Sequence, residues 1–186
     1  MFPDSYTFKE SFVFQSGLID PQPGYPSFKP GQTMYDNHIE ALDMALDKSW
    51  EFYSGVACDL HRILTKGIPF FEDHNFSGRY RTVDCWIGHD LCPNPLIIPQ
   101  LMDVWHTHIN ELMKESKLPP IEIAWICHHM FEVIHPFIDG NGRTGRLLFN
   151  KVLSQLGEQP RIIYFKDRFQ YYDSINEFKD KYFANY

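Results

Sequence analysis

The segment from Ile121 to Ile134 has almost no polar face, and it constrains the fold more than any other feature of the chain. Its length and apolar spacing predict a helix. Apolar side chains point in nearly every direction around that helix: Ile123, Trp125, Ile126, Cys127, Met130, Phe131, Val133 and Ile134. Because a helix that is apolar nearly all round needs cover on every side, we expect it to be buried at the centre of the molecule. A chain of 186 residues is long enough to provide that cover in one domain.

Helical spacing recurs elsewhere, and strands are few. Apolar periodicity predicts one helix over residues 36–64, or two with a break near Gly55, and further helices over residues 99–117, 147–156 and 167–183. The stretch from Arg79 to Gly88 is rich in aromatic and β-branched residues and predicts a strand, with Leu96–Ile98 as its partner. A lone hairpin is only marginally stable, so this one must lean on the helices.

Residues 1–34 hold five of the 13 prolines and little apolar periodicity. They predict an irregular N-terminal arm that lies on a main domain of residues 35–186. Four phenylalanines are the expected anchors of the arm: Phe2, Phe8, Phe12 and Phe14.

Composition excludes several classes of function. The formal net charge of -7 argues against non-specific nucleic-acid binding, which needs a basic surplus. No apolar stretch approaches the roughly 20 residues that span a membrane, and the start of the chain lacks a signal-peptide pattern. The four cysteines form no C-x-x-C pair. These features predict a cytoplasmic protein with reduced thiols.

A glycine-rich stretch, HPFIDGNGRTGRLL, follows the apolar helix directly and spans His135 to Leu148. Gly140, Gly142 and Gly145 spell G-x-G-x-x-G, the fingerprint of a dinucleotide-binding turn. That turn requires a strand before the glycines, whereas a helix precedes them here, and the chain has no alternation of strands and helices. The dinucleotide interpretation therefore fails.

The physical meaning of the glycines nevertheless holds. Backbone N–H groups at the start of a helix form an anion site, and glycine allows close approach to a phosphate. Arg143 and Arg146 lie three residues apart and can grip further phosphates. Asp139 is placed to hold a divalent cation, and His135 offers a base near neutral pH. Together they predict a site for a nucleoside triphosphate with Mg²⁺.

The stretch from His135 to Arg146 is similar to the signature of the Fic (filamentation induced by cAMP) family, H-P-F-x-[D/E]-G-N-G-R-x-x-R, and matches all nine specified positions. Gly78–Val83 resembles the start of the family's β-hairpin flap, and Asp167–Ile175 resembles its later tyrosine-bearing helix. The resemblance covers residues 36–180. It implies an all-α fold, a Fic-type helical bundle with a small β-hairpin flap beside the active site.

The resemblance also implies an activity, the transfer of AMP from ATP to a Tyr, Ser or Thr hydroxyl of a target protein with release of pyrophosphate. His135 would be the general base, and Asp139 would coordinate the Mg²⁺ that bridges the α- and β-phosphates. Asn141, with the backbone amides of Gly140 and Gly142, would hold the α-phosphate. The resemblance further implies that Arg143 and Arg146 would neutralise the phosphates of the leaving pyrophosphate. Phe137 would anchor the loop in the core, and Tyr172 and Asn150 would line the adenine pocket.

Two kinds of partner are expected. A target protein segment would add as a strand to the flap edge of residues 81–88. The resemblance also implies that activity is commonly restrained by a helix bearing [S/T]-x-x-x-E-[G/N], whose glutamate pairs with the second motif arginine. Only partial matches were found, at Thr107–Glu111 and Ser154–Glu158, which predicts a separate small antitoxin-like inhibitor or no restraint.

Two other functions compete with this hypothesis. One is a metal-dependent phosphohydrolase that uses four residues resembling an HD-type pattern: His61, Asp84, His89 and Asp90. The other is a catalytically idle module that keeps the fold as a binding surface, which the intact His135 and Asp139 count against.

Overall fold

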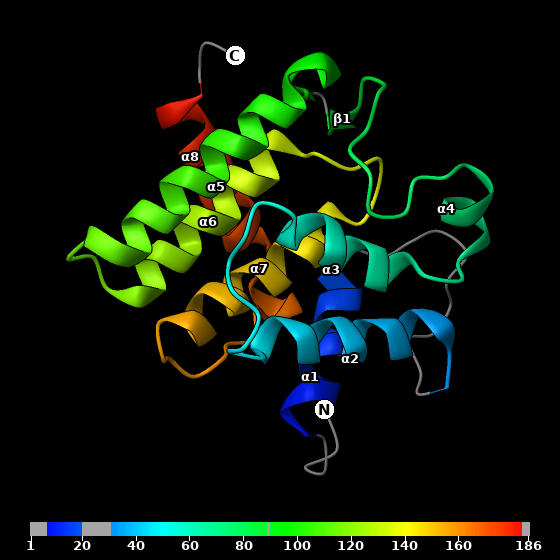
Figure 1. Cartoon of the computed structure of the whole chain (residues 1–186), viewed down its shortest axis with the longest axis horizontal. Coiled ribbons are helices and arrows are strands. Elements are labelled where there is room, and N and C mark those ends of the chain that lie inside the picture. Colours follow the sequence, from blue (N-terminus) through cyan, green and yellow to red (C-terminus); the bar gives the residue numbers. More distant parts are fainter. Residues whose placement is uncertain (1–6, 20–30, 89, 184–186) are drawn as a thin grey trace.

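The computed structural model describes residues 7–19, 31–88 and 90–183 (Figure 1). Within these ranges the chain forms α-helices and a single two-stranded antiparallel sheet. The α-helices are α1 (Phe8–Ile19), α2 (Thr33–Leu46), α3 (Val56–Thr65), α4 (Pro69–Asp73), α5 (Ile98–Glu115), α6 (Pro120–Ile134), α7 (Asn141–Gln155) and α8 (Arg168–Tyr182). The strands are β1 (Trp86–Ile87) and β2 (Asp90–Leu91), and two short 3-10 turns are η1 (Pro95–Ile97) and η2 (Phe165–Asp167). The predicted all-α fold with a small hairpin is confirmed.

Helix α6 lies at the centre, as its apolar surface predicts. It packs against α5 on one side, and against α7 and α8 on others (Figure 1). Its side chains Ala124, Cys127 and Phe131 are fully buried. Helix α7 follows it through the glycine loop and packs against α1, α2, α3 and α6. The two consecutive helices therefore form the core, and the loop that joins them is held from both ends.

The other helical predictions hold in number and order, although α7 begins at Asn141, six residues before the predicted start of the helix over residues 147–156. The segment 36–64 forms two helices, α2 and α3, separated by residues 47–55, so the break predicted near Gly55 is present. Helices α5 and α8 begin and end within two residues of the predicted bounds. None of the helices in the described residues is long and apolar enough to cross a membrane.

The irregular arm predicted for residues 1–34 is wrong where the structure describes it, because residues 8–19 form the helix α1. Thr7 and Glu10 explain its start. The Thr7 hydroxyl accepts from the Glu10 amide, and the Glu10 carboxylate accepts from the Thr7 amide, which is a reciprocal capping box. Phe12 and Val13 then pack into the core, as predicted for Phe12. The prolines that suggested an irregular arm all lie outside α1, and Phe2 lies outside the described residues.

The flap hairpin is shorter than predicted, and its second strand was misassigned. Strand β1 pairs with β2, with Trp86 opposite Leu91 and Ile87 opposite Asp90. Leu96 and Ile97 instead belong to η1, and Ile98 begins α5. Asn94 causes this, because its side chain accepts from the Leu96 amide and closes a turn where a strand would continue.

Candidate active site

His135 ends the central helix in a left-handed conformation, with φ of 50° and ψ of 60°. This conformation is uncommon for a residue other than glycine and costs about 1 kcal/mol. It turns the chain abruptly out of α6 while the His135 amide still donates to the Phe131 carbonyl at 2.9 Å. The ring Nδ1 donates to the Glu132 carbonyl at 3.3 Å, which leaves Nε2 as the acceptor nitrogen. The ring therefore carries its basic nitrogen on the side away from the helix backbone.

The loop after His135 is fixed by a buried amide. The Asn141 side chain accepts from the Phe137 amide at 2.9 Å and donates to the Phe137 carbonyl at 2.8 Å. Asn141 is 2% exposed, so both ends of its carboxamide serve the loop in a site without bulk water. Phe137 itself is fully buried, as predicted for an anchor. Asn141 thus shapes the loop, a contribution that the sequence prediction did not include.

His61, on α3, joins the loop to the start of the flap. Its ring stacks on Phe137 with centroids 3.9 Å apart, its Nε2 donates to the Asp139 carbonyl at 2.9 Å, and its Nδ1 accepts from the Gly78 amide at 2.9 Å. Burial lowers the pKa of His61 to about 4. The ring is therefore neutral near pH 7, as a neutral tautomer with one donor and one acceptor requires.

The start of α7 is open. Gly140 is its N-cap residue with φ of 81°, a conformation that suits glycine, and it has no side chain with which to cap the first turn. The first intrahelical bond in that turn runs from the Thr144 amide to the Gly140 carbonyl at 3.0 Å. Amides of the first turn of a helix have no partner within the helix, and they favour an anion. The geometry therefore matches the anion site predicted from the glycines.

The two motif arginines differ in their surroundings. Arg143 is 2% exposed, and its guanidinium turns back to Asp139, with 3.3 Å between Nη2 and Oδ2. The Asp139 side chain is 29% exposed, so its carboxylate is the accessible member of this pair. Arg146 is also 2% exposed, but it forms no salt bridge with any of the described residues.

Arg146 is held by α1 and α8. Its Nε donates to the Ser16 hydroxyl at 2.8 Å and its Nη2 to the Ser16 carbonyl at 2.9 Å. A longer contact of 3.4 Å joins Nη1 to the Tyr171 hydroxyl. The sequence prediction missed Ser16, because the arm was expected to be irregular. A partial signal was present: the stretch from Ser11 to Ser16 reads S-x-x-x-Q-S, which differs from the inhibitory pattern at two positions, with glutamine in place of glutamate and serine in place of glycine or asparagine.

These residues surround a cavity of about 740 Å³, within the size range of small-molecule sites. Of the predicted site residues, the structure brings seven to its wall: His135, Asp139, Gly140, Asn141, Gly142, Arg146 and Tyr172. Arg143 does not line it. Asn150 does not either, contrary to its predicted place in the adenine pocket, because its carboxamide binds the backbone of Arg161 and Arg146.

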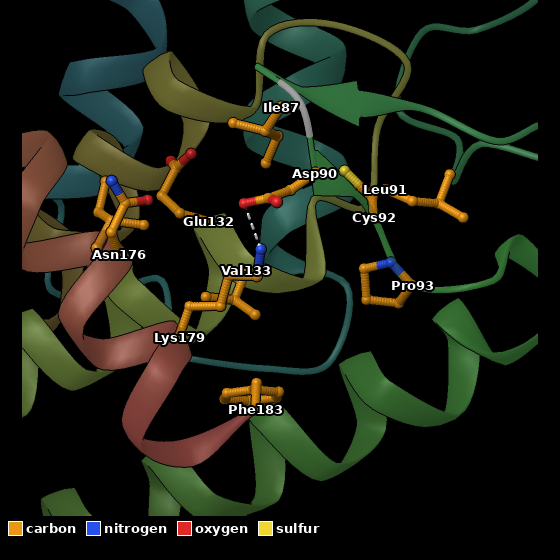
Figure 2. A pocket seen from close by; sticks show the side chains of 11 residues that line it. Ile87, Asp90, Leu91, Cys92, Pro93, Glu132, Val133, Asn176, Lys179 and Phe183 are labelled. Carbon is orange, nitrogen blue, oxygen red and sulfur yellow. Dashed lines mark hydrogen bonds and ion pairs between the residues drawn. The ribbon is translucent and has the colours of Figure 1, made fainter. Parts of the chain in front are cut away.

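The cavity wall also contains residues that the sequence prediction did not include. Ile19 comes from α1, Trp86 and Ile87 from the flap, and Ile175 from α8. A smaller apolar pocket of about 50 Å³ adjoins the cavity and shares Ile87 and Ile175 with it. Figure 2 shows this pocket between the flap and α8, with the Lys179 ammonium bound to the Asp90 carboxylate at 2.6 Å.

The phosphohydrolase alternative finds no support here. Both ring nitrogens of His61 are hydrogen bonded, so neither is available to a metal. No group of three or more His, Cys, Asp or Glu side chains in the described part of the chain is arranged to hold a metal ion. His89 lies outside the described residues.

The fold and the site define a class: an all-helical protein whose central helix ends at a basic histidine and leads through a glycine loop into an open helix start. Solved structures share this fold. A Fic domain containing protein from Bacteroides thetaiotaomicron aligns with a TM-score of 0.77 at 23% identity, over 93% of this chain and 72% of that one. A variant of Fic-1 from Caenorhabditis elegans aligns with a TM-score of 0.67 at 25% identity, over 92% of this chain and 55% of that one.

The sequence profile of the Fic/DOC family matches residues 52–153, more than half of the chain. The chain belongs to the Fic/DOC family.

Among the curated relatives, the "Protein adenylyltransferase Fic" of Nematostella vectensis is 39% identical over 158 residues, 80% of this chain and 36% of that protein. The "Protein adenylyltransferase fic-1" of Caenorhabditis elegans is 38% identical over 103 residues, 54% of this chain and 20% of that protein. The chain therefore spans about a third or less of the length of these relatives.

Proposed function

We propose that this chain is a protein adenylyltransferase, which transfers AMP from ATP to a Tyr, Ser or Thr hydroxyl of a target protein and releases pyrophosphate. One observation carries the proposal: His135, whose Nδ1 is already a donor, and the first residues of α7 line one cavity. A base and an anion site that share a cavity suit the attack of a hydroxyl on a phosphorus atom. The names of the relatives in two animal lineages support the same chemistry.

His135 would take the proton of the attacking hydroxyl on Nε2. Because Nδ1 already donates to the Glu132 carbonyl, the tautomer needed for a base at Nε2 is set before the substrate arrives. The attacking oxygen forms a bond to the α-phosphorus, the bond from that phosphorus to the bridging oxygen breaks, and pyrophosphate leaves. The first-turn amides of α7, including that of Gly142, would stabilise the charge that develops on the α-phosphate.

Asp139 suits a magnesium ion. Mg²⁺ is usually held by one or two carboxylates together with substrate phosphates, and the partly exposed Asp139 carboxylate is an oxygen donor on the cavity wall. The ion would neutralise charge on the phosphates. Arg143, which already contacts Asp139, would hold that carboxylate in position and add positive charge beside it.

The base and ribose would lie on the apolar side of the cavity. Ile87 on the flap, Tyr172 and Ile175 on α8 and Ile19 on α1 provide that side. The Tyr172 hydroxyl donates to the Ile19 carbonyl at 2.7 Å, so this wall joins α8 to α1. These residues replace Asn150 in the proposed adenine pocket.

Arg146 would bind the phosphates that leave as pyrophosphate. Two of its donors are directed to Ser16, which is neutral. A phosphate oxygen carries charge and is the stronger acceptor, so it would draw the guanidinium away from Ser16. The contact between α1 and Arg146 is therefore one that a nucleotide can displace. A separate small antitoxin-like inhibitor, the absence of any restraint, and a cytoplasmic location stay predictions.

Incubation with ATP labelled on the α-phosphate tests the proposal. We expect label on protein with Mg²⁺ present, and no label with ATP labelled on the γ-phosphate. His135→Ala should abolish the labelling while retaining nucleotide binding, because the base is removed and the anion site is kept. His108→Ala is the matched control, since His108 is exposed on α5 away from the cavity.

Three outcomes oppose the proposal in different ways. Labelling that persists in His135→Ala contradicts the role of the base. Release of free phosphate or AMP without labelled protein favours a hydrolase. Nucleotide binding without any turnover, in the presence of a cell lysate as a source of targets, favours the idle binding module.

A further inference from the structure

Two cysteines face each other across the base of the flap. The ladder places Trp86 opposite Leu91, so the next residues outward are Cys85 and Cys92. The Cys92 amide donates to the Cys85 carbonyl at 3.0 Å, which shows that the pairing continues to these residues. Directly opposed residues in such a hydrogen-bonded pair have Cα atoms about 5.5 Å apart, within the range that a disulfide spans. The Cys85 side chain is close enough to contribute to the raised pKa of the Cys92 thiol.

The two thiols differ in exposure, which assigns them different chemical roles. Cys85 is half-buried, whereas Cys92 is 6% exposed and lines the apolar pocket beneath the flap (Figure 2). Burial, first, and the neighbouring Cys85 thiol raise the pKa of Cys92 to about 12, so Cys92 is protonated and unreactive by itself. An oxidant in solution therefore meets Cys85 first. The other two cysteines, Cys58 and Cys127, lie on α3 and α6.

We propose that Cys85 and Cys92 form a redox-active pair that closes a disulfide across the base of the flap when the protein meets a peroxide. The Cys85 sulfur attacks the peroxide, whose O–O bond breaks, and becomes a sulfenic acid with release of water. The Cys92 sulfur then attacks the Cys85 sulfur, loses its proton and displaces the hydroxyl as a second water. The two thiols together lose two electrons and two protons, and the peroxide is reduced to water.

The disulfide would fix the flap in its paired form. A hairpin with only two described pairs is marginally stable by itself, and a cross-link at its base removes open conformations. The base is already tied to the active site by Arg81, which donates from Nη2 to the Pro93 carbonyl at 2.6 Å and from Nε to the His135 carbonyl at 2.8 Å. Oxidation at Cys85 and Cys92 therefore stiffens a segment that is hydrogen bonded to the backbone of the proposed base. The disulfide itself does not depend on the proposed adenylyl transfer.

Hydrogen peroxide titration of the full chain, followed by differential alkylation and peptide mass spectrometry, tests the proposal. We expect the peptides that contain Cys85 and Cys92 to become linked, with the loss of two hydrogens, while Cys58 and Cys127 stay open to alkylation after unfolding. A thiol reductant should restore both thiols. Cys85→Ser and Cys92→Ser should each abolish the link, and Cys58→Ser is the matched control that should keep it.

Hydrogen exchange of the Cys92 amide gives a second readout that does not use activity. Because the link closes a short loop, exchange should slow by on the order of tenfold or more in the oxidised protein. Three results would overturn the proposal: oxidation of Cys85 to sulfinic acid without a link, a link to another chain, and unchanged exchange of the Cys92 amide in the linked form. Since none of these measurements uses ATP, their failure is distinct from failure of the proposed adenylyl transfer.

Discussion

The carboxamide of Asn141 provides a test of how the active-site loop is built. Replacing it in Asn141→Ala removes the acceptor for the Phe137 amide and the donor to the Phe137 carbonyl. Two hydrogen bonds contribute together about 1–3 kcal/mol, and each backbone group left buried without a partner adds about 1–3 kcal/mol where water does not reach it. Some water will enter the space left by the side chain, so we expect the free energy of unfolding to fall by roughly 3 kcal/mol.

Asn141→Asp refines this test, because it keeps the shape of the side chain and the acceptor. The second carboxylate oxygen would face the Phe137 carbonyl oxygen in place of a donor, and the two oxygens repel. Protonation of the new carboxyl group restores a donor. The destabilisation of Asn141→Asp relative to the wild-type protein should therefore shrink as the pH is lowered, whereas that of Asn141→Ala should not.

Urea unfolding followed by circular dichroism measures both variants, and the rate of protein labelling is measured in parallel below the unfolding transition. If the side chain mainly shapes the loop, stability and activity should fall together. A destabilisation of Asn141→Ala below about 1 kcal/mol, the contribution of a single hydrogen bond, would refute the reasoning. Loss of activity at full stability would instead assign the side chain directly to the phosphate, as the sequence alone suggested.

Two further predictions concern stability. In Gly145→Ala the new Cβ would overlap the Glu132 Oε1 and lie 2.8 Å from the His128 Nδ1, and both of these side chains are buried. Overpacking should therefore outweigh the gain in helix propensity of about 1 kcal/mol and lower the free energy of unfolding by roughly 1–3 kcal/mol. A variant more stable than wild type in urea would contradict the packing around Gly145. Burial lowers the pKa of His61 and His129 to about 4, below the ordinary value near 6.5. Because the unfolded chain then binds more protons than the folded one, the stability present above pH 6.5 should be lost as the pH falls toward 4, and the slope of this loss should be smaller in His129→Gln. A urea midpoint that stays constant between pH 6.5 and pH 4 would show that these rings are protonated in the folded protein.

Sequence patterns were most informative where a single local rule decides the structure. The nearly all-round apolar surface of residues 121–134 predicted a buried central helix, because only a central position removes every side of such a helix from water. The run from His135 to Arg146 placed a base, a carboxylate and an anion-binding helix start close together in the chain, so their proximity needed little tertiary information. The position of His135, Asp139, Gly140 and Arg146 on one cavity wall agrees with that expectation.

Predictions failed where competing local signals were close in strength. The prolines on both sides of residues 8–19 predicted an irregular arm, whereas the Thr7–Glu10 capping box starts the helix α1 there. In the flap, the β-branched character of residues 96–98 suggested a strand, whereas the Asn94 side chain closes a turn there. Both errors concern short segments, whose conformation depends on one or two hydrogen bonds.

The sequence by itself thus determined the helical class, the central helix and the chemical content of the loop, because helical periodicity and a contiguous motif are local properties. Only the tertiary structure decided that Ser16 holds Arg146, 130 residues away in the chain, that His61 joins the loop to the flap, and that Asn150 faces away from the cavity. The packing of α1, α3 and α8 around α7 sets these contacts. No spacing within the chain encodes the contacts of His61 and Asn150, since each depends on which distant faces the buried core brings together.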